Sequence, residues 1–538
     1  MTLGKNLGIV LHSHIPYVIG YGKWPHGLIY LLEAASESYL PLLDVLEKSE
    51  GKNILTFSVT PVLLEQLRSQ RFINIFRNYL KERLLSAKED LNYFNKSNQI
   101  MYKKVANFWV TFYSHQLNSN LDIATRFKQL LHDEKIDIIT SAATHGYLPL
   151  LGYDKCIDVQ IRVGVEAYER FFGKKPQGIW LPESAYRPGY RWKNPITGEE
   201  SKRKGIEYFL SKYDLKFFFV DSHLIEGGEA IGVYLEKFEG LRIIYDRMKN
   251  ELIPNKKPLN IYQPYRLDSE ERPLFVFGRD KKTGLQVWSG EHGYPGDEWY
   301  LEFHKKKFPS GHRYWRVTNP KYDLADKKIY EPERVEERLL SHSSHFKGLV
   351  EEILKKDNNI FIAAPYDTEL FGHWWFEGPQ FLKRLIEGFK NSFVDLNTPA
   401  NYLKNNQPEE VIKLPEGSWG KGGFHWIWLN DSTKWVWKKI YDAEKIMLNV
   451  AKKQGNDKVK DLMARELLLL ESSDWEFLIS TLSAKDYAEN RISEHYENFN
   501  KLKLMLDKKK HNEGDRIFLK ELEDRNKIFE FLTSKYYV

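Results

Sequence analysis

Two acidic residues stand directly behind short apolar runs of the sequence, where a side chain can do acid–base or nucleophilic chemistry. Asp367 follows one such run, and Glu183 follows another that ends in Pro182. Because proline lacks a backbone donor, Glu183 is predicted at the exit of a buried strand. A carboxyl next to Trp180 is partly desolvated in any compact fold, so it has either a structural partner or a chemical task. The structural alternative for Glu183 is an ion pair with Arg187.

A pair of carboxyl groups is what glycosyl transfer with retention of configuration requires. One group is the nucleophile that forms a covalent glycosyl-enzyme, and the other protonates the departing oxygen from about 5 to 5.5 Å away. The acid must keep its proton near neutral pH. Glu369 and the aromatic residues up to Trp375 could raise the pKa of Asp367 through a like charge and apolar burial. Glu183 and Asp367 are therefore the candidate pair, provided that the fold brings them together.

Histidines form a second group of candidates, at His12, His14 and His145. The His-x-His pattern could bind a metal ion, because alternate residues at the end of a strand can reach one ion. The sequence contains no HExxH and no CxxC pattern. Neutral imidazoles that hydrogen-bond a sugar ring are the simpler interpretation, and a structural role for His14 stays open. A metal-dependent hydrolase that uses His12, His14 and Asp221, such as a polysaccharide deacetylase, is the more distant alternative.

Tryptophans in stretches rich in glycine and proline are the third group. These are Trp288, Trp299, Trp419, Trp426, Trp428 and Trp475. Sugar rings present apolar faces that stack on indoles, so this set suits a glucan-binding cleft. The alternative is that they pack the junction between two domains. Arg279 and Asp280 could bind sugar hydroxyls or form an ion pair at the end of a turn.

Apolar runs of strand length recur along the chain and must position these side chains. They are 7–11, 54–59, 136–139, 179–181, 217–220 and 360–364. Helical patterns at 31–48, 156–172 and 331–356 lie between them. Fully apolar strands that alternate with helices indicate an α/β fold with a parallel sheet covered on both faces. If the sheet closes into a barrel, the candidate residues converge at its C-terminal rim, where such barrels build their sites.

Three domains are predicted from the places where this alternation stops. The catalytic barrel takes residues 1–187 and 266–408, and an inserted subdomain with a long loop takes 188–265. From residue 409 to 538 helical spacing dominates, at 434–453, 458–472 and 484–509, so a C-terminal helical domain is expected.

Composition excludes several classes of protein. The chain has 538 residues and a formal net charge of +6, and its basic clusters are interspersed with acidic residues, so no nucleic-acid partner is expected. The apolar run near the N-terminus is too short for a signal peptide or a spanning helix, so no membrane partner is expected. One cysteine, Cys156, rules out an internal disulfide and fits a reducing cytoplasm. A monomer is expected.

Five segments together resemble the ordered motifs of glycoside hydrolase family 57. They read HSHIPY from His12, HGYLPL from His145, WLPESAY from Trp180, APYDTELFGH from Ala364 and SSDW from Ser472. The likeness is strongest to the 1,4-α-glucan branching enzymes of that family and covers nearly the whole chain. Five motifs in order are far more specific than any one of them.

The resemblance implies a distorted TIM-like (β/α)7 barrel with an inserted subdomain and a C-terminal helical domain. It implies Glu183 as nucleophile and Asp367 as acid/base, an α-glucan as substrate, and neither metal nor cofactor. Further substrate contacts are implied at Arg279, Gly296, Trp419, Asp474 and Trp288. Branching members carry a loop tyrosine that keeps water from the intermediate, and Tyr234 is the candidate. The segment 226–264 that holds it is longer than the usual loop, and Ser184 stands where a cysteine or another small residue is common.

Three outcomes of one glycosyl-enzyme remain open at this stage. Attack by a 6-hydroxyl makes an α-1,6 branch, attack by water makes the enzyme an α-amylase, and attack by a 4-hydroxyl makes it a 4-α-glucanotransferase. Loop geometry decides among them, because it excludes water and orients the acceptor. A protein that only binds glucan is the weakest hypothesis, because binding does not explain carboxyls at two strand ends.

Overall fold

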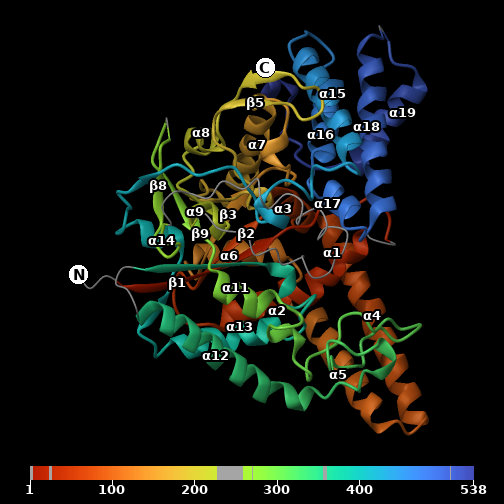
Figure 1. Ribbon diagram of the computed structural model, residues 1–538. Coiled ribbons are helices and arrows are strands. Elements are labelled where there is room, and N and C mark those ends of the chain that lie inside the picture. The colour runs from red at the N-terminus through yellow and green to blue at the C-terminus, as the bar shows by residue number, and fades with distance from the viewer. Residues whose placement is uncertain (1–3, 24–26, 227–258, 270, 356–359, 509) are drawn as a thin grey trace.

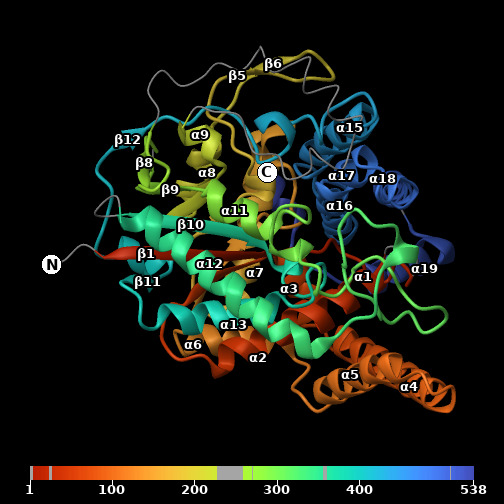
Figure 2. The ribbon, with the colours of Figure 1, turned by 60° about the horizontal axis from the view of Figure 1, so that its bottom comes forward.

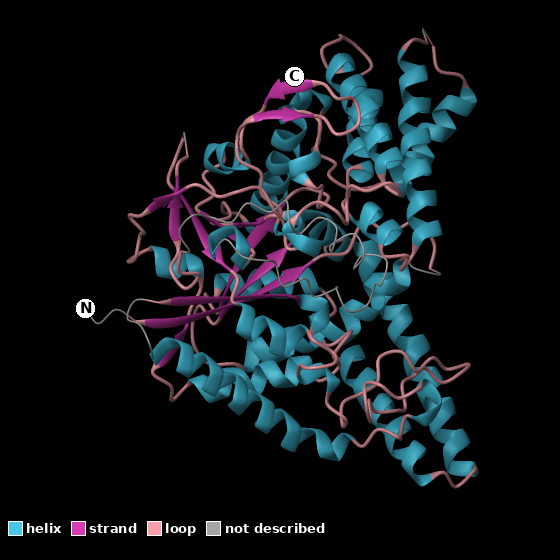
Figure 3. Ribbon diagram, in the orientation of Figure 1, coloured by secondary structure: helices cyan, strands magenta, loops and turns pink. Residues whose placement is uncertain are grey.

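A computed structural model describes residues 4–23, 27–226, 259–269, 271–355, 360–508 and 510–538 (Figure 1). Tyr234, the candidate loop tyrosine, lies outside the described residues, as does most of the segment around it. Most strands gather in the central and left part of the view, and helices lie above, below and to the right of them (Figure 3). This is the α/β layering that the alternating pattern predicts.

Seven parallel strands form a closed ring. One sheet has the order β10-β1-β2-β3-β4, and β7 pairs in parallel with β9 in a second sheet. Two isolated parallel bridges, Gly178 with Phe217 and Arg279 with Ala363, join the sheets at both ends and so close the ring. The strands are β1 (Lys5–Ser13), β2 (Leu55–Val59), β3 (Ile136–Ser141), β4 (Ile179–Trp180), β7 (Phe217–Val220), β9 (Leu274–Gly278) and β10 (Phe361–Asp367). The predicted (β/α)7 barrel is therefore confirmed.

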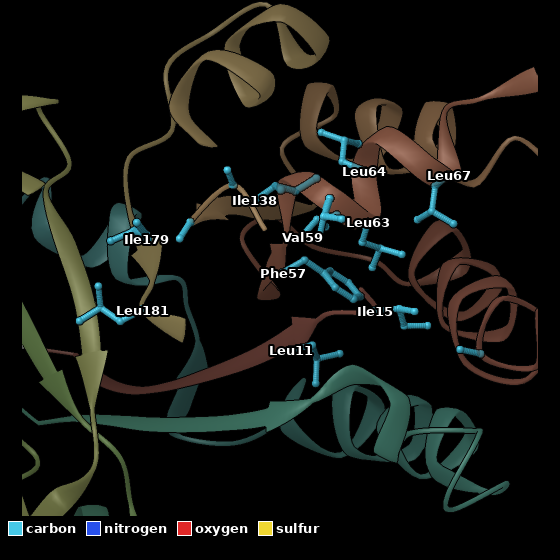
Figure 4. Close-up of a cluster of buried hydrophobic side chains, with 14 of the residues drawn as sticks. Leu11, Ile15, Phe57, Val59, Leu63, Leu64, Leu67, Ile138, Ile179 and Leu181 are labelled. Atoms are coloured by element: carbon cyan, nitrogen blue, oxygen red, sulfur yellow. The ribbon is translucent and has the colours of Figure 1, made fainter. Parts of the chain in front are cut away.

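The barrel strands are apolar throughout because both of their faces are buried. Val10, Ile139 and Trp180 belong to a cluster in which aromatic side chains from β7, β9 and β10 fill the inside of the ring. The alternate residues face outward. Leu11, Phe57 and Ile138 lie among the buried side chains between the strands and the helix that carries Leu63, Leu64 and Leu67 (Figure 4). Alternation along each strand thus fills an inner and an outer core at once.

Helices connect most of the strands. Between β1 and β10 these are α1 (Leu28–Ala34), the π-helix η1 (Ala35–Tyr39), α2 (Leu40–Lys48), α3 (Pro61–Leu67), α4 (Gln70–Lys96), α5 (Ile100–Leu117), α6 (Ile123–His132), α7 (Asp154–Phe172), α8 (Ile206–Lys212), α9 (Ser222–Glu226), α11 (Lys281–Trp288) and α12 (Val335–Lys355). After β10 come α13 (Gly378–Phe389), β11 (Val394–Leu396), α14 (Pro399–Leu403) and β12 (Val411–Ile412). The helices predicted at 31–48, 156–172 and 331–356 are confirmed, the first with a π-helical turn inside it.

Two parts of this architecture are missing from the sequence prediction. Strand β9 closes the ring although the apolar run 274–278 is not among the predicted strands. Helices α4 and α5 pair as a long hairpin inserted between β2 and β3, well away from the strands (Figure 2). Both have ordinary signals in the sequence, an apolar pentapeptide in one case and two long amphipathic stretches in the other.

The segment 188–265 contributes to two different structures. Strands β5 (Arg191–Lys193) and β6 (Glu200–Lys202) form a separate antiparallel hairpin, and β8 (Tyr265–Leu267) pairs antiparallel with β9. Strand β7, in the same segment, is part of the barrel wall. The three-domain division itself stays a prediction. Its boundary at residue 188 assigns β7, a strand of the barrel, to the inserted subdomain.

The C-terminal part is helical, as predicted. Its main helices are α15 (Lys434–Val450), α16 (Asp457–Leu470), α17 (Asp474–Ser480), α18 (Lys485–Leu506) and α19 (Glu513–Arg525). They gather on one side of the barrel in both views (Figures 1 and 2). No helix among the described residues is long and apolar enough to cross a membrane.

Helix α7 packs onto the barrel through a glycine. The carbonyl oxygen of Gly164 accepts a hydrogen bond from the Thr140 hydroxyl at 3.0 Å. A Cβ atom at Gly164 would lie 2.2 Å from the carbonyl oxygen of Ser141, which belongs to β3. Only glycine therefore permits this approach of helix and strand.

Replacing Gly164 by alanine is expected to lower the free energy of unfolding by on the order of 1 to 3 kcal/mol, because the helix must shift away from β3. Gly348, inside α12, is the matched control, since nothing lies within 4 Å of a Cβ added there. Gly348→Ala is expected to raise the same quantity by about 0.5 to 1 kcal/mol. Denaturant unfolding of both variants measures the difference, and equal shifts for the two would contradict this packing.

Candidate active site

The two candidate carboxyls lie at the same rim of the barrel. Asp367 ends β10, where its Cα is paired in register with that of His12 on β1. The His12 ring stacks on Trp180 of β4, with ring centroids 4.9 Å apart, and Glu183 follows three residues later. The C-terminal ends of parallel barrel strands share one rim, and this is where barrel enzymes build their sites. Residues that are remote in the sequence are thus brought together as the strand pattern predicts.

The backbone at Glu183 is held in an unfavourable conformation. Glu183, Ser184 and His145 have φ angles of 59°, 47° and 60°, in the left-handed region that side chains disfavour. Each such residue costs of order 1–3 kcal/mol and persists only where its surroundings fix it. Here the Trp419 amide donates to the Glu183 carbonyl at 3.1 Å, and Tyr186 and Gly417 form a bridge just beyond.

Two donors hold the Glu183 carboxyl. The indole N–H of Trp419 donates to Oε2 at 2.9 Å, and the hydroxyl of Ser473 contacts Oε1 at 3.1 Å. The Nδ1 atom of His145 lies 3.7 Å from the same Oε1. Both oxygens are therefore held, so the plane of the carboxyl group is fixed.

The surroundings keep both candidate acids protonated to unusually high pH. Burial raises the pKa of Glu183 to about 7, against the hydrogen bond from Trp419, and the nearby charges of Asp474 and Asp367 add to the rise. Burial also lifts the pKa of Asp367 well above its usual range, and Glu369 adds to this while Arg279 opposes it. Both carboxyls are thus shifted toward their protonated form, while the hydrogen bond from Trp419 favours ionisation of Glu183.

The segment after Asp367 is fastened to the π-helix η1. The Tyr39 hydroxyl donates to Oε1 of Glu369, and the amide of His373 donates to the Ser38 hydroxyl at 2.9 Å. Burial raises the pKa of Glu369 to about 7. π-Helical turns occur often at functional sites. Here the turn positions the like charge that the sequence predicts beside Asp367.

The three histidines form a stack whose ring nitrogens all have protein partners. Rings of His14 and His145 stack at 3.9 Å, and those of His12 and His145 at 5.1 Å. His12 contacts Ser58 and His145, His145 contacts Ser473, and His14 contacts Thr60 and Asp474, all within 3.1 Å. Burial, helped by the neighbouring imidazoles, holds the pKa of His12 and His145 well below the usual value.

Among the residues that the structure describes, two sets of side chains have donor atoms close enough together for a metal ion. The donor atoms of His14, His145 and Asp474 lie within 4.8 Å of one another, and so do those of a second set, Cys156, Glu444 and Glu471. In the first set the ring nitrogens already make the hydrogen bonds described above, so an ion would have to replace them. Asp221, a ligand in the metal hypothesis, instead faces Arg279 and His223, each at 3.5 Å.

Aromatic and basic side chains form a wall beside Glu183. The Arg279 guanidinium carbon lies 5.7 Å from the ring centroids of both Trp288 and Trp419. Trp419 also packs against Trp180, with centroids 5.2 Å apart. These predicted contact residues are brought together. Trp428 and Trp475 are instead fully buried, so for these two the alternative of domain packing holds.

Gly296 and Asp474 have different surroundings. Gly296 ends a tight turn, where an added Cβ would lie 2.2 Å from the carbonyl oxygen of Gly290, so the turn itself requires glycine. Asp474 begins α17 beside the histidines. Although burial opposes it, the charge of His14 lowers the pKa of Asp474 to about 2. Asp474 is therefore an ionised acceptor at the site. Gly296 instead packs against the backbone of Gly290 and lies near Pro320.

One group at Glu183 is missing from the predicted set. Ser473 lies within the SSDW motif, yet only its neighbour Asp474 is predicted there. The backbone amide of Ser473 donates to the carbonyl oxygen of His145 at 3.2 Å, and Ser472 forms a β-bridge with Gly146. These backbone contacts fix the start of α17 at the rim of the barrel. The available signal in the sequence is the serine pair Ser472–Ser473, which stands directly before Asp474 in the same motif.

Two buried carboxyls at the C-terminal rim of a closed parallel barrel are the arrangement of barrel glycosidases. Residues 8–415 match the sequence profile of glycosyl hydrolase family 57. The chain belongs to glycosyl hydrolase family 57. Residues 439–537 match the profile of the C-terminal region of 1,4-alpha-glucan branching enzymes.

Relatives of the whole chain carry related names. A 1,4-alpha-glucan branching enzyme of Thermococcus kodakarensis is 42% identical over 97% of this chain and 77% of its own length. The crystal structure of a branching enzyme from Pyrococcus horikoshii has a TM-score of 0.87 at 41% identity, covering 99% of this chain and 97% of that one. The alpha-amylase AmyC of Thermotoga maritima has a TM-score of 0.81 at 26% identity, covering 100% and 99%.

The hydrogen bond from Trp419 to Glu183 is expected to affect the pH dependence of activity. If Glu183 acts in its ionised form, activity is lost as the pH falls through the pKa of Glu183. Trp419→Phe keeps the ring but removes the donor to Oε2, which raises that pKa, and the acidic limb of kcat/KM should move up by about one pH unit. Profiles of kcat/KM against pH measure this shift. Trp428→Phe is the control, because that buried ring is not bonded to Glu183, and an equal shift in both variants would contradict the assignment.

Proposed function

We propose that the chain is a 1,4-α-glucan branching enzyme that cleaves α-1,4 linkages and forms α-1,6 branches through a covalent glycosyl-enzyme. The observation that carries this proposal is the contribution of the C-terminal helices to the rim. The region that matches the branching-enzyme profile begins at residue 439 and includes Ser473 and Asp474, which bond to Glu183 and His14. The relatives named as branching enzymes add support over the full length of the chain.

The proposed reaction has two steps with one acid and one nucleophile. Ionised Glu183 attacks the anomeric carbon of an α-1,4 linkage, while Asp367 gives its proton to the departing glucan oxygen. The 6-hydroxyl of an acceptor glucan then attacks the same carbon and returns its proton to Asp367, which frees Glu183. Two displacements retain the α configuration. The high pKa of Asp367 suits it to the first half of the cycle, and its ionised form suits the second.

The remaining site residues are proposed to bind the glucan. Trp288 and Trp419 offer faces for stacking sugar rings, and Arg279 and Asp474 offer charged partners for hydroxyls. Gly296 is proposed as a contact through its backbone only. Tyr234 is proposed as the loop residue that keeps water from the intermediate.

Hydrolysis is the second candidate, because a protein named as an alpha-amylase shares the fold at a TM-score of 0.81. A 4-α-glucanotransferase would differ only in which hydroxyl attacks. We propose amylose, glycogen or starch-like chains as substrates, action as a monomer in the cytoplasm as part of glycogen biosynthesis, and no cofactor. The buried free thiol of Cys156 supports the cytoplasmic assignment.

Product analysis on amylose tests the proposal. Branching is expected to weaken iodine staining and to create chains that a debranching enzyme releases, with few new reducing ends. Glu183→Gln and Asp367→Asn should each lower turnover at least a thousandfold while leaving the unfolding temperature unchanged, because each removes one of the two reacting groups. Reducing ends that rise without new branch points would refute branching in favour of hydrolysis.

A chelator arm separates the glycosidase chemistry from the metal hypothesis. Activity is expected to be the same before and after prolonged dialysis against EDTA, because no step of the proposed reaction uses a metal ion. Activity that falls with EDTA and returns with a divalent cation would instead support the deacetylase class.

A further inference from the structure

A row of hydrogen bonds runs from the inside of the barrel to the Glu183 carboxyl. Ser58 Oγ lies 3.0 Å from Nδ1 of His12, whose Nε2 lies 3.0 Å from Nε2 of His145. Nδ1 of His145 then lies 2.9 Å from Oγ of Ser473, which lies 3.1 Å from Oε1 of Glu183. All four residues before Glu183 are at least 97% buried. Strands β1 and β2, the turn after β3 and the start of α17 each supply one member.

The direction of donation along this row follows from its last member. An ionised carboxylate only accepts, so the Ser473 hydroxyl must donate to Glu183 and must accept from His145. His145 then carries its proton on Nδ1 and accepts at Nε2 from His12. His12 in turn carries its proton on Nε2 and accepts at Nδ1 from the Ser58 hydroxyl. Each group thus has one role, and every proton points toward Glu183.

Both imidazoles must be neutral for this arrangement, because a doubly protonated ring has no acceptor nitrogen. Their burial satisfies that condition. A neutral row also costs less to bury than a charged one. The two rings stack on each other, and His12 also stacks on Trp180, which restrains both rings further.

We propose that Ser473 is a positioning residue that, oriented by Ser58, His12 and His145, holds the Glu183 carboxylate ionised and in the orientation for attack. This rests on the proposed role of Glu183 as nucleophile. It gives His12 and His145 a task other than the predicted contact with a sugar ring, because their nitrogens are already bonded within the protein. It also makes the C-terminal helical part a contributor to the chemical step.

A glucosyl donor with a good leaving group isolates the step that Ser473 serves. With α-maltotriosyl fluoride, the bond from C1 to an oxygen of Glu183 forms as the C1–F bond breaks, and fluoride leaves with the bonding electrons. No proton from Asp367 is needed to expel fluoride. The maltotriosyl group then passes to the hydroxyl of an acceptor glucan supplied in saturating excess, so that formation of the glycosyl-enzyme limits the rate. Fluoride release measured over a range of donor concentrations then gives kcat and KM for that step.

Ser473→Ala removes one oxygen atom, and it is expected to lower kcat for fluoride release about ten- to hundredfold with KM within about twofold of wild type. Ser473→Thr keeps the hydroxyl and should recover most of the lost rate. Ser211→Ala is the matched control, since that buried serine donates to the Tyr208 carbonyl oxygen within its own helix. Its kcat should equal that of wild type.

Wild-type kcat in Ser473→Ala would overturn the proposal, as would a rise in KM in place of the fall in kcat. A threonine variant as slow as the alanine variant, with an unchanged unfolding temperature, would also overturn it. Glu183→Gln separates this failure from a failure of the proposed function. If Glu183→Gln still releases fluoride at the wild-type rate, Glu183 is not the nucleophile. If fluoride release is lost in Glu183→Gln but unchanged in Ser473→Ala, only the role of Ser473 is refuted.

Discussion

The removal of two carboxyl groups from water is the constraint on which the site depends. Burial disfavours the charged form of each and so raises both pKa values, and the two carboxyls then differ in their neighbours. Asp367 is given a buried neighbour of like charge, Glu369, whereas Glu183 is given hydrogen bonds from Trp419 and Ser473. This difference in environment supports the proposed roles of Asp367 as acid and Glu183 as nucleophile.

The donors of Glu183 come from parts of the chain that lie beyond the barrel strands. Trp419 follows β12, and Ser473 immediately precedes α17. Backbone pairing fastens both segments to the rim, at Tyr186 with Gly417 and at Gly146 with Ser472. These contacts also fix the left-handed backbone at Glu183 and His145. The helical part is therefore more than a cover on the barrel, because without it the Glu183 carboxyl would lose the donor Ser473 and the backbone at His145 would lose a support.

The sequence predicts the strands well where apolar runs end in polar residues. Six of the seven barrel strands, the candidate acids and the histidine cluster follow from that one pattern, because parallel strands must bring their C-terminal ends together. Strand β9 is missing from the predicted strands, although its apolar run at 274–278, directly before Arg279, is an ordinary strand signal. The hydrogen-bond partners of the Glu183 carboxyl could not be predicted from the sequence. Which hydroxyl reaches Glu183 depends on how α17 docks, and no local pattern around Ser473 encodes that docking.

Trapping the intermediate tests the central claim most directly. In Asp367→Asn, α-maltotriosyl fluoride can still form the glycosyl-enzyme, because fluoride leaves without a proton. The base that would deprotonate the acceptor hydroxyl is missing, so the sugar stays on the enzyme. Mass spectrometry of proteolytic peptides is expected to find one maltotriosyl group, on Glu183. A sugar attached to any other residue, or fluoride release with no attached sugar, would contradict the account.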